Sequence, residues 1–480
     1  MVVQFPGGRA PAPAAQTFGA RTALQWLRMR LTIEKLIYGG DGLARGPAGE
    51  SGSGKAVFLP FVLPGEVIEA QALEEKPGFL RAWPETVVGP SPHRIPAQCP
   101  YFGRCGGCHY QHAGYEYQLQ AKAAILTETL QRIGRFAVPP VQVHPSPPWH
   151  YRNRTRMQMR AGAGASAKRK EDSGSFMLGY FSFGSRDWLP VEQCPISSPL
   201  INRAVGVIWQ LGRSRQVSHA IGEIEFFVNA ADAQLLVEIS LSAKSRAVFA
   251  EPALVQFVAA LREQVPEVCG VAVFRASSRG PAVHEAVPKK LRPLFGAQEL
   301  LYQAGGYEYR VSAGSFFQTN RYLTDTLIEL VTAGSAGDTA LDLYAGAGLF
   351  TLPLARAFRE VTAVEAAATS FHDLERNVPP NVKAIHQSTE DFLRRSGEYR
   401  NQSLDLIVAD PPRAGLGEKT AAELGRLRTS RVNYVSCDPA TLARDLRVLL
   451  AAGFCLERLD LVDLFPQTFH IEAVAHLVRK

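Results

Sequence analysis

Short apolar runs alternate with helical patterns over the last third of the chain. Four of these runs are short, β-prone and bounded by a turn or a charge, and they cover residues 339–344, 361–365, 404–409 and 432–436. Strands spaced by helices are typical of βαβ units, which build a parallel sheet. We therefore predict an α/β domain over residues 305–480, with ligands bound beyond the carboxyl ends of its strands.

The first third of the chain has a different pattern. From residue 31 to about residue 88, apolar and polar positions alternate and are broken by Gly-rich turns at 38–42 and 49–54. Short strands at this spacing predict a small β-barrel. A helix is expected over 115–133, with Leu119, Ala123, Leu126 and Leu130 on one stripe.

These patterns predict a multidomain α/β protein with an OB-like barrel, a central α+β domain and a Rossmann-like C-terminal domain. The central region contains a low-complexity loop of Gly, Ala, Ser and Lys at 161–175. The expected parts are a disordered extension at 1–30, the barrel at 31–90, the central domain at 91–304 and the C-terminal domain at 305–480.

Composition excludes some classes of protein and suggests a partner. The 480 residues are 46% apolar and 20% charged, which is typical of a folded globular chain. No stretch approaches ~18 uninterrupted apolar residues, so an ordinary transmembrane helix is excluded. The net charge is +7, but residues 1–170 carry 21 basic and 10 acidic residues, so the remainder is net negative. This asymmetry favours a polyanion partner, although a mildly basic surface would give the same count.

A cofactor site is indicated by polar residues at the ends of the predicted C-terminal strands. Gly346 and Gly348 follow the first strand and allow a tight turn with close approach of a ligand. The third glycine of a dinucleotide fingerprint is missing. Glu365 ends the next strand, 17 residues after Gly348, where a carboxylate can accept both ribose hydroxyls. With Asp410-Pro-Pro-Arg413 at a further strand end, the layout resembles the S-adenosylmethionine (SAM)-dependent methyltransferase fold more than a dehydrogenase.

Candidate chemistry lies at the next strand end. Cys437 precedes a helix whose N-terminus is expected to favour the thiolate, and Glu472 follows 35 residues later at the start of an apolar strand. A thiol, SAM and a carboxylate together suit methylation at C5 of a pyrimidine. Thiolate addition at C6 makes C5 nucleophilic, and a base then removes the C5 proton.

Four motifs in this order closely resemble the RNA uracil-C5 (5-methyluridine) methyltransferases. They are Gly314-Ser-Phe-Phe-Gln-Thr-Asn320, Asp410-Pro-Pro-Arg-Ala-Gly415, Ser436-Cys-Asp-Pro-Ala-Thr441 and Phe469-His-Ile-Glu472. The resemblance implies that Cys437 is the nucleophile and Glu472 the base. It also implies a SAM site lined by Gln318, Tyr344, Glu365 and Asp410. Leu349 departs from the family, which usually carries a polar Asn there. Phe316 and Phe317 are candidates for base stacking, although aromatic core packing explains them equally well.

Four of the seven cysteines are candidate metal ligands. Cys99, Cys105 and Cys108 fall within ten residues, and Cys194 follows 86 residues later. This spacing fits metal ligation better than a secreted disulfide framework and leaves both zinc and an iron–sulfur cluster open. Members of the family that act on ribosomal RNA are similar here, so the resemblance implies a [4Fe-4S] cluster on these four thiols.

RNA contacts are expected in the basic half. Arg152, Arg154 and Arg156 recur every second residue of a predicted strand, which puts them on one face suited to phosphates. The barrel resembles a TRAM domain through Ile33-Glu-Lys-Leu-Ile-Tyr-Gly-Gly-Asp-Gly-Leu-Ala-Arg45 and Val62-Leu-Pro-Gly-Glu66.

The resemblance favours a uridine of 23S rRNA as the target, because the tRNA branch of the family generally lacks both barrel and cluster. A tRNA uracil-C5 methyltransferase is the alternative, and a catalytically inactive, cluster-bearing RNA-binding protein is an alternative of another class. Cytosine-C5 enzymes usually carry a cysteine directly after an Asp-x-Pro strand end, where this chain has Arg413. We expect a cytoplasmic monomer that does not bind a membrane.

Overall fold

The computed structural model describes residues 3–4, 28–46, 54–160, 176–242, 251–275, 292–395, 399 and 402–480. Two compact units divide the chain. The first comprises Met1–Leu126, Tyr180–Val191 and Phe465–His470, and the second comprises Thr127–Gly179, Glu192–Leu464 and Ile471–Lys480. The predicted loop at 161–175 and most of the predicted extension lie outside the described residues.

A closed β-barrel forms in the first unit, as the alternating pattern predicts. Its strands follow the order β6-β4-β3-β2-β5, and β5 pairs with β6 to close the barrel. Alternate side chains point inward, so Leu31, Ile33, Val57 and Leu59 are all buried in its core. The strands are β1 (Val3–Gln4), which pairs with β6, β2 (Arg28–Leu36), β3 (Asp41–Arg45), β4 (Ala56–Pro60), β5 (Val67–Lys76) and β6 (Phe79–Gly89).

The helix predicted over 115–133 is confirmed as α1 (Tyr115–Thr129), which continues into a π-helical turn (Leu130–Gly134). Along the predicted stripe Leu126 and Leu130 are buried, Leu119 and Ala123 are half-buried, and Gln118 and Lys122 are buried beside them. Gln118 and Lys122 bury their polar groups because the segment 465–470 supplies partners. The Gln118 amide donates to Gln467 Oε1 at 3.0 Å, and Lys122 Nζ donates to the carbonyl of residue 465 at 2.9 Å.

A mixed sheet occupies the central part of the chain in the order β9-β8-β11-β12-β13-β14. Strands β12 and β13 run parallel, while the pairs β8–β11 and β11–β12 are antiparallel. This is the α+β arrangement predicted for the region. The elements here are β8 (Arg154–Arg160), β9 (Met177–Phe181), β10 (Trp188–Pro190), α2 (Pro199–Arg213), β11 (Ile221–Val228), β12 (Leu235–Leu241), α3 (Pro252–Gln264), β13 (Val268–Arg275) and β14 (Arg292–Gly296).

A hairpin and a short helix precede the C-terminal sheet. Strands β15 (Glu299–Ala304) and β16 (Tyr307–Ser312) pair antiparallel, and the predicted motif 314–320 follows β16 directly. The helix α4 (Thr324–Thr332) then leads into the sheet.

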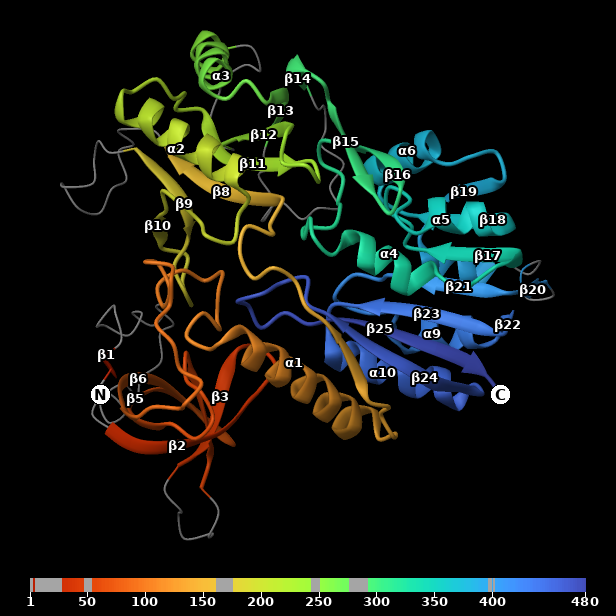
Figure 1. Cartoon of the computed structure of the whole chain (residues 1–480), viewed down its shortest axis with the longest axis horizontal. Coiled ribbons are helices and arrows are strands. Elements are labelled where there is room, and N and C mark those ends of the chain that lie inside the picture. Colours follow the sequence, from red (N-terminus) through yellow and green to blue (C-terminus); the bar gives the residue numbers. More distant parts are fainter. Residues whose placement is uncertain are drawn as a thin grey trace. The chain divides into compact units, whose positions relative to one another are not determined.

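The predicted parallel sheet is confirmed in the second unit. Its order is β19-β18-β17-β21-β23-β25-β24-β7, and Figure 1 shows the strands of residues 337–480 side by side in cyan and blue. The five neighbouring strands β19, β18, β17, β21 and β23 are parallel to one another. Strand β25 runs antiparallel between β23 and β24. The strands are β7 (Val141–His144), β17 (Gly337–Leu343), β18 (Phe358–Glu365), β19 (Val382–His386), β21 (Leu406–Ala409), β23 (Arg431–Ser436), β24 (Phe454–Val462) and β25 (Glu472–Arg479).

Helices between these strands cover the sheet. The helix α9 packs against both α7 and α10, and α4 packs against α5. Since successive parallel strands need a crossover connection, the helices follow from the topology. They are α5 (Thr351–Ala357), α6 (Ala368–Asn377), α7 (Thr389–Arg395), α9 (Gly417–Gly425) and α10 (Pro439–Ala451), and two short strands, β20 (Ser403–Leu404) and β22 (Arg428–Thr429), pair outside the main sheet. Among the described residues, no helix is long and apolar enough to cross a membrane.

Candidate active site

Five of the predicted site residues stand at one edge of the C-terminal sheet. Tyr344 follows β17, Glu365 ends β18, Asp410 follows β21, Cys437 follows β23, and Glu472 begins β25. Because β25 runs antiparallel to the others, its first residue lies at the edge where the parallel strands end. The strand order thus gathers residues that are up to 128 positions apart in the sequence.

The register of β23 and β25 puts Cys437 beside Glu472. Ser436 pairs with Ala473 as the last pair of this ladder, so the residues that follow and precede them are neighbours. Asp410 is on the other side of β23, because Ala409 pairs with Tyr434 and the Asp410 amide donates to the carbonyl of residue 343. The structure therefore brings the predicted nucleophile, the predicted base and a second carboxyl group together.

The charges at this edge act on the thiol. Burial raises the pKa of Cys437 to about 12, the negative charges of Glu472, Asp410 and Asp438 act in the same direction, and Arg413 opposes them. The expectation that the helix N-terminus favours the thiolate is wrong for this structure. The carboxylate of Asp438 caps α10 by accepting from the amides of Ala440 and Thr441, both at 2.9 Å, and so adds a negative charge where the free helix end would be positive.

The two carboxyl groups next to the thiol hold their protons unusually strongly. Burial raises the pKa of Glu472 well above its ordinary value, and the charge of Asp410 raises it further. Burial and the charge of Asp342 raise the pKa of Asp410 in the same way. Perturbed carboxyl groups of this kind cluster at sites where protons are transferred.

The Gly-rich turn after β17 is held by Glu365, a contact that the sequence did not predict. Glu365 Oε2 accepts from the Gly346 amide at 2.8 Å, and its Oε1 accepts from the Ala367 amide at 2.6 Å. Tyr344 takes a left-handed conformation with φ of 63°, which is strained for a residue with a bulky side chain, and its hydroxyl donates to Glu390 at 3.1 Å. A strained residue held by its own side chain, next to a turn that Glu365 holds, is typical of a ligand-binding site.

The motif at 314–320 is fixed from two sides. Asp373 on α6 accepts from the Ser312 amide at 2.8 Å and from the hydroxyls of Ser312 and Ser315. Gln318 is buried, and its carbonyl accepts from the Asn153 side chain at 3.0 Å. The sequence drew no attention to Asp373, whose place on an amphipathic helix is equally typical of a solvent-facing residue.

Phe316 and Phe317 have different surroundings. Phe317 is buried and its ring lies 4.8 Å from the ring of Tyr302, so core packing accounts for it. The Phe316 side chain is 57% exposed. Only Phe316 therefore offers a surface on which a base can stack.

The predicted arginine face is corrected by the structure. Arg154 is buried, and its guanidinium donates to Glu225 at 2.5 Å, to Glu238 at 2.8 Å and to the carbonyl of Ser315. Arg156 also pairs with Glu225, at 2.5 Å. The interpretation of Arg154 as a phosphate contact is wrong, because both acidic partners lie on strands β11 and β12 of the same sheet, which the two-residue period of β8 does not reveal.

Asp342 is a buried carboxyl group to which the sequence assigned no role. It accepts a hydrogen bond from Thr351 Oγ1, and burial raises its pKa to about 7. Its second oxygen, Oδ1, is buried without a hydrogen-bond partner among the described residues. A buried acceptor left open next to the Gly-rich turn fits a site that takes a polar ligand. An aspartate within the apolar run of β17 is the signal that could have identified it.

The cysteines predicted to bind a metal are divided between the two units. Cys99, Cys105 and Cys108 belong to the first unit, and Cys194 belongs to the second. Their loops are ordered by side-chain amides: the Cys99 amide donates to Gln111 Oε1 at 3.1 Å, and the Cys194 amide donates to Asn202 Oδ1 at 2.8 Å. Within the described ranges, no three His, Cys, Asp or Glu side chains are gathered as a metal site.

Comparison with known proteins gives the same reaction class as the site. Residues 114–480 match the family described as tRNA (Uracil-5-)-methyltransferase. An uncharacterized RNA methyltransferase of Aquifex aeolicus is 33% identical over 462 residues, covering 94% of this chain and 98% of that protein. The 23S rRNA (uracil(1939)-C(5))-methyltransferase RlmD of Pectobacterium carotovorum is 32% identical over 463 residues and covers 95% of each chain.

Among solved structures, the fold is similar to that of the Pyrococcus abyssi tRNA (uracil-54, C5)-methyltransferase in complex with S-adenosyl-L-homocysteine. The TM-score is 0.70 at 22% identity, over 94% of this chain and 100% of that one. The family match covers more than half of the chain and agrees with the arrangement of Asp410, Cys437 and Glu472 at the sheet edge. The chain belongs to the tRNA (uracil-5-)-methyltransferase family.

Proposed function

We propose that this protein transfers the methyl group of SAM to C5 of a uridine in RNA. The observation that carries the proposal is the register of β23 and β25, which brings Cys437 and Glu472 together beside Asp410. A thiol and a base on one edge of a SAM-type sheet suit methylation of a pyrimidine carbon better than methylation of an amino group, which needs no thiol.

The residues of the site have separate tasks in this reaction. Cys437 adds through sulfur to C6 of the uracil, which turns the ring into an enolate whose C5 is nucleophilic. SAM supplies the methyl group to that carbon when it is bound. Glu472 then removes the proton from C5, the C6–S bond breaks, and Cys437 leaves as the thiolate.

The raised pKa of Cys437 bears on the first step. Burial holds the thiol protonated in the unliganded protein, and the charges of Glu472 and Asp410 add to this effect wherever these two groups are ionised. Protonation of either carboxylate, or its engagement by a ligand, removes one of the charges that oppose ionisation. The thiol therefore becomes reactive chiefly when the site is filled.

We propose that Gln318, Tyr344, Glu365 and Asp410 line the SAM site. The turn at Gly346 and Gly348 brings the backbone close to a ligand, and Glu365 lies beside it at the end of β18. The open Asp342 Oδ1 supports a polar ligand next to this turn. In this arrangement Glu365 accepts the ribose hydroxyls and Asp410 stands between the cofactor and the target base.

For the RNA, we propose a uridine of 23S rRNA, bound by the barrel at 31–90 and the central domain at 91–304, while residues 305–480 carry the chemistry. Relatives named as 23S rRNA methyltransferases that are about 30% identical along nearly the whole chain support this choice. A tRNA uridine is the second candidate, favoured by the fold of the Pyrococcus abyssi enzyme. A uracil within folded RNA would have to leave its stack to reach Cys437.

We also propose that Cys99, Cys105, Cys108 and Cys194 ligate a [4Fe-4S] cluster with a structural role. Four thiols are a complete ligand set for such a cluster. Iron and sulfide content, with a broad thiolate-to-iron absorption band, would test it, and each Cys→Ser variant is expected to lose both. A colourless protein with stoichiometric zinc would contradict this assignment.

The function is tested with purified protein, tritiated-methyl SAM and RNA. We expect 5-methyluridine in 23S rRNA transcripts, and tritium release when RNA labelled at uracil C5 is used instead. Product in tRNA alone would favour the second candidate, and 5-methylcytidine would contradict the reaction. No product with either RNA, at normal RNA binding, would indicate a catalytically inactive RNA-binding protein.

A further inference from the structure

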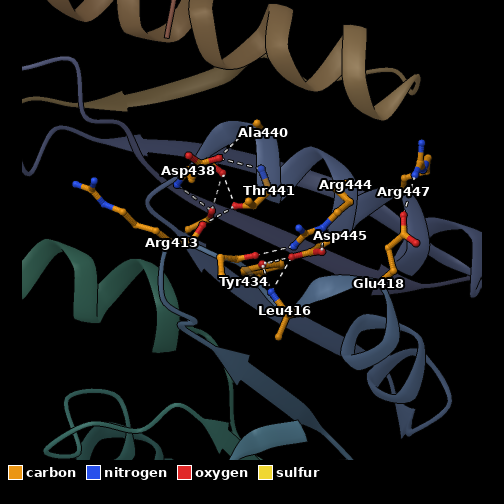
Figure 2. A network of polar contacts seen from close by, with 12 residues as sticks. Arg413, Leu416, Glu418, Tyr434, Asp438, Ala440, Thr441, Arg444, Asp445 and Arg447 are labelled. Atoms are coloured by element: carbon orange, nitrogen blue, oxygen red, sulfur yellow. Dashed lines mark hydrogen bonds and ion pairs between the residues drawn. The ribbon is translucent and has the colours of Figure 1, made fainter. Parts of the chain in front are cut away.

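The helix α10 begins two residues after Cys437 and lies against the loop that follows Asp410. Three of its side chains bond to the backbone of that loop, residues 413–416 (Figure 2). Thr441 Oγ1 donates to the carbonyl of Arg413 at 3.2 Å, and Arg444 Nη2 donates to the carbonyl of Ala414 at 2.8 Å. The carboxylate of Asp445 accepts from the Leu416 amide at 2.7 Å.

Asp445 is the centre of these contacts. It is fully buried and accepts from three donors, which are the Leu416 amide, the Tyr434 hydroxyl at 2.7 Å and Arg444 Nε at 2.8 Å. Tyr434 lies on β23, three residues before Cys437. One carboxylate thus joins the strand that leads to the thiol, the helix that follows it and the loop after Asp410. A buried carboxylate with three good donors is held rigidly in one geometry.

The loop lies so close to α10 that its sequence is restricted. Gly415 has φ of 70°, and a Cβ atom there would lie 2.4 Å from Asp445 Oδ2 and 2.8 Å from Arg444 Nη2. Neither group can move away easily, because both are committed to hydrogen bonds. The glycine is therefore required by the close approach as well as by its backbone conformation.

The loop matters for the chemistry because it carries Arg413. Among the groups that act on the thiol, Glu472, Asp410 and Asp438 oppose its ionisation, and Arg413 is the cation that favours it. Arg413 acts in the same sense on Glu472. Figure 2 shows the Arg413 side chain extending away from the contacts around Asp445, so the three hydrogen bonds from α10 hold the backbone of its loop and do not involve its guanidinium.

We propose that Asp445 is a positioning residue: by holding residues 413–416 on α10 and β23, it keeps the Arg413 guanidinium where its charge acts on Cys437 and Glu472. The inference rests on the proposed function for its catalytic consequence. Its electrostatic part concerns the thiol alone and needs neither RNA nor SAM.

The test is alkylation of Cys437 by iodoacetamide, followed across pH by mass spectrometry of its peptide. In Asp445→Asn, one oxygen becomes an amide that cannot accept, so the loop loosens and the profile is expected to move to higher pH. At a fixed pH below the midpoint, we expect the rate to fall by about threefold, as for a pKa change of about half a unit. Arg413→Gln should shift the profile in the same direction. In turnover, Asp445→Asn should lower kcat for RNA methylation more than it changes KM.

Two further variants keep the test decisive. Thr441→Val removes only the hydroxyl that bonds to the Arg413 carbonyl and to Asp438, and it should shift the profile in the same direction by less, even if Asp445→Asn does not fold. Glu418→Gln is the matched control. It breaks the exposed pair with Arg447, 3.2 Å apart, which joins α9 to α10 without touching residues 413–416, and it should leave the profile unchanged.

The inference would be overturned if Arg413→Gln shifts the alkylation profile while Asp445→Asn and Thr441→Val leave it unchanged. A profile that Arg413→Gln leaves in place would overturn it as well. If the wild-type protein methylates no RNA, the proposed function fails, and the alkylation profiles still decide whether Asp445 positions Arg413.

Discussion

Burial, together with the charges of Glu472 and Asp410, controls the ionisation of Cys437, and Arg413 acts against them. Glu472 in turn holds its proton more strongly because of burial and Asp410. The nucleophile and the base are therefore electrostatically coupled, and changing one alters the other. At the scale of single residues, this coupling separates the site from an ordinary buried cysteine.

Replacing Glu472 by Gln should trap the enzyme on its RNA. The amide cannot take the C5 proton, so C6–S cleavage is blocked after methyl transfer. We expect a covalent protein–RNA adduct on denaturing gels and a turnover rate lower by about 10²–10⁴-fold. Cys437→Ala is the control and should give neither adduct nor product. Normal turnover in Glu472→Gln would mean that another group is the base.

The same variant has a consequence without RNA. Because Glu472 opposes ionisation of the thiol, its neutral replacement should lower the pKa of Cys437. Peptide-resolved alkylation of Cys437 should therefore move to lower pH in Glu472→Gln, opposite in direction to Arg413→Gln. A shift to higher pH would contradict the opposing effect of Glu472 on ionisation of the thiol.

At the scale of elements, strand β8 contacts the motif at 314–320 through the side chain of Arg154, which also forms buried ion pairs. Arg154 bonds to Glu225, Glu238 and the carbonyl of Ser315. The side chains of Arg154 and of both glutamates are almost fully buried. The central sheet thus contacts the segment that carries Gln318. An arginine in this place is structural, because its guanidinium is buried and bonds to two carboxylates and a carbonyl within the protein.

Replacing Arg154 by Met should destabilise the fold strongly, since it leaves two buried carboxylates without their partner. We expect the free energy of unfolding in urea to fall by about 3–5 kcal/mol. The exposed pair of Arg359 with Asp338, 3.3 Å apart, offers a control, and Arg359→Gln should cost less than about 1 kcal/mol. Equal effects of the two variants would contradict the structural role of Arg154.

Strands β7, β24 and β25 are linked by another buried carboxylate. Burial alone would raise the pKa of Asp460, but hydrogen bonds from His476, Arg458 and His144 lower it from 3.8 to about 2. The carboxylate contributes stability above its unfolded pKa and loses that contribution as the pH falls through about 2.

Asp460→Asn should remove this contribution. Acid unfolding followed by circular dichroism should show the variant less stable than wild type by about 1–2 kcal/mol near neutral pH, with the difference shrinking between about pH 4 and pH 2. A difference that stays constant over this window would show that packing, rather than charge, explains the loss.

At the scale of the whole molecule, the positive charge is concentrated in residues 1–170, and the proposed reaction site lies in the remainder. Part of that positive charge is neutralised within the protein, because Arg154 and Arg156 form ion pairs with acidic side chains. The charge available to RNA is therefore smaller than the sequence count indicates, although it remains positive.

RNA binding should depend steeply on salt, and Arg156 should not contribute. We expect the slope of log Kd against log[KCl] to be the same for Arg156→Gln and wild type, because this guanidinium is held by Glu225. A phosphate contact would reduce the slope by about one. Such a reduction would restore the interpretation of Arg156 as an RNA contact.

Local patterns in the sequence predicted many of the strands and the residues that stand at their ends. The runs at 339–344 and 432–436 became β17 and β23, and the residues at their ends are those that the motifs indicated, since strand ends and Gly-rich turns are set by near neighbours. The alternation of Leu31, Ile33, Val57 and Leu59 likewise predicted the barrel core.

Tertiary structure alone decided the electrostatic surroundings of Cys437, the burial of Arg154 and the contacts of Asp445. Each depends on partners far away in sequence, such as Glu472 for the thiol, Glu238 for the guanidinium and Leu416 for the carboxylate. The asymmetry of charge predicted a negatively charged partner. Only the packing of the strands showed which arginines are already neutralised by carboxylates of the protein. Electrostatic effects follow distance in space, and a local pattern contains no information about which distant segment comes near.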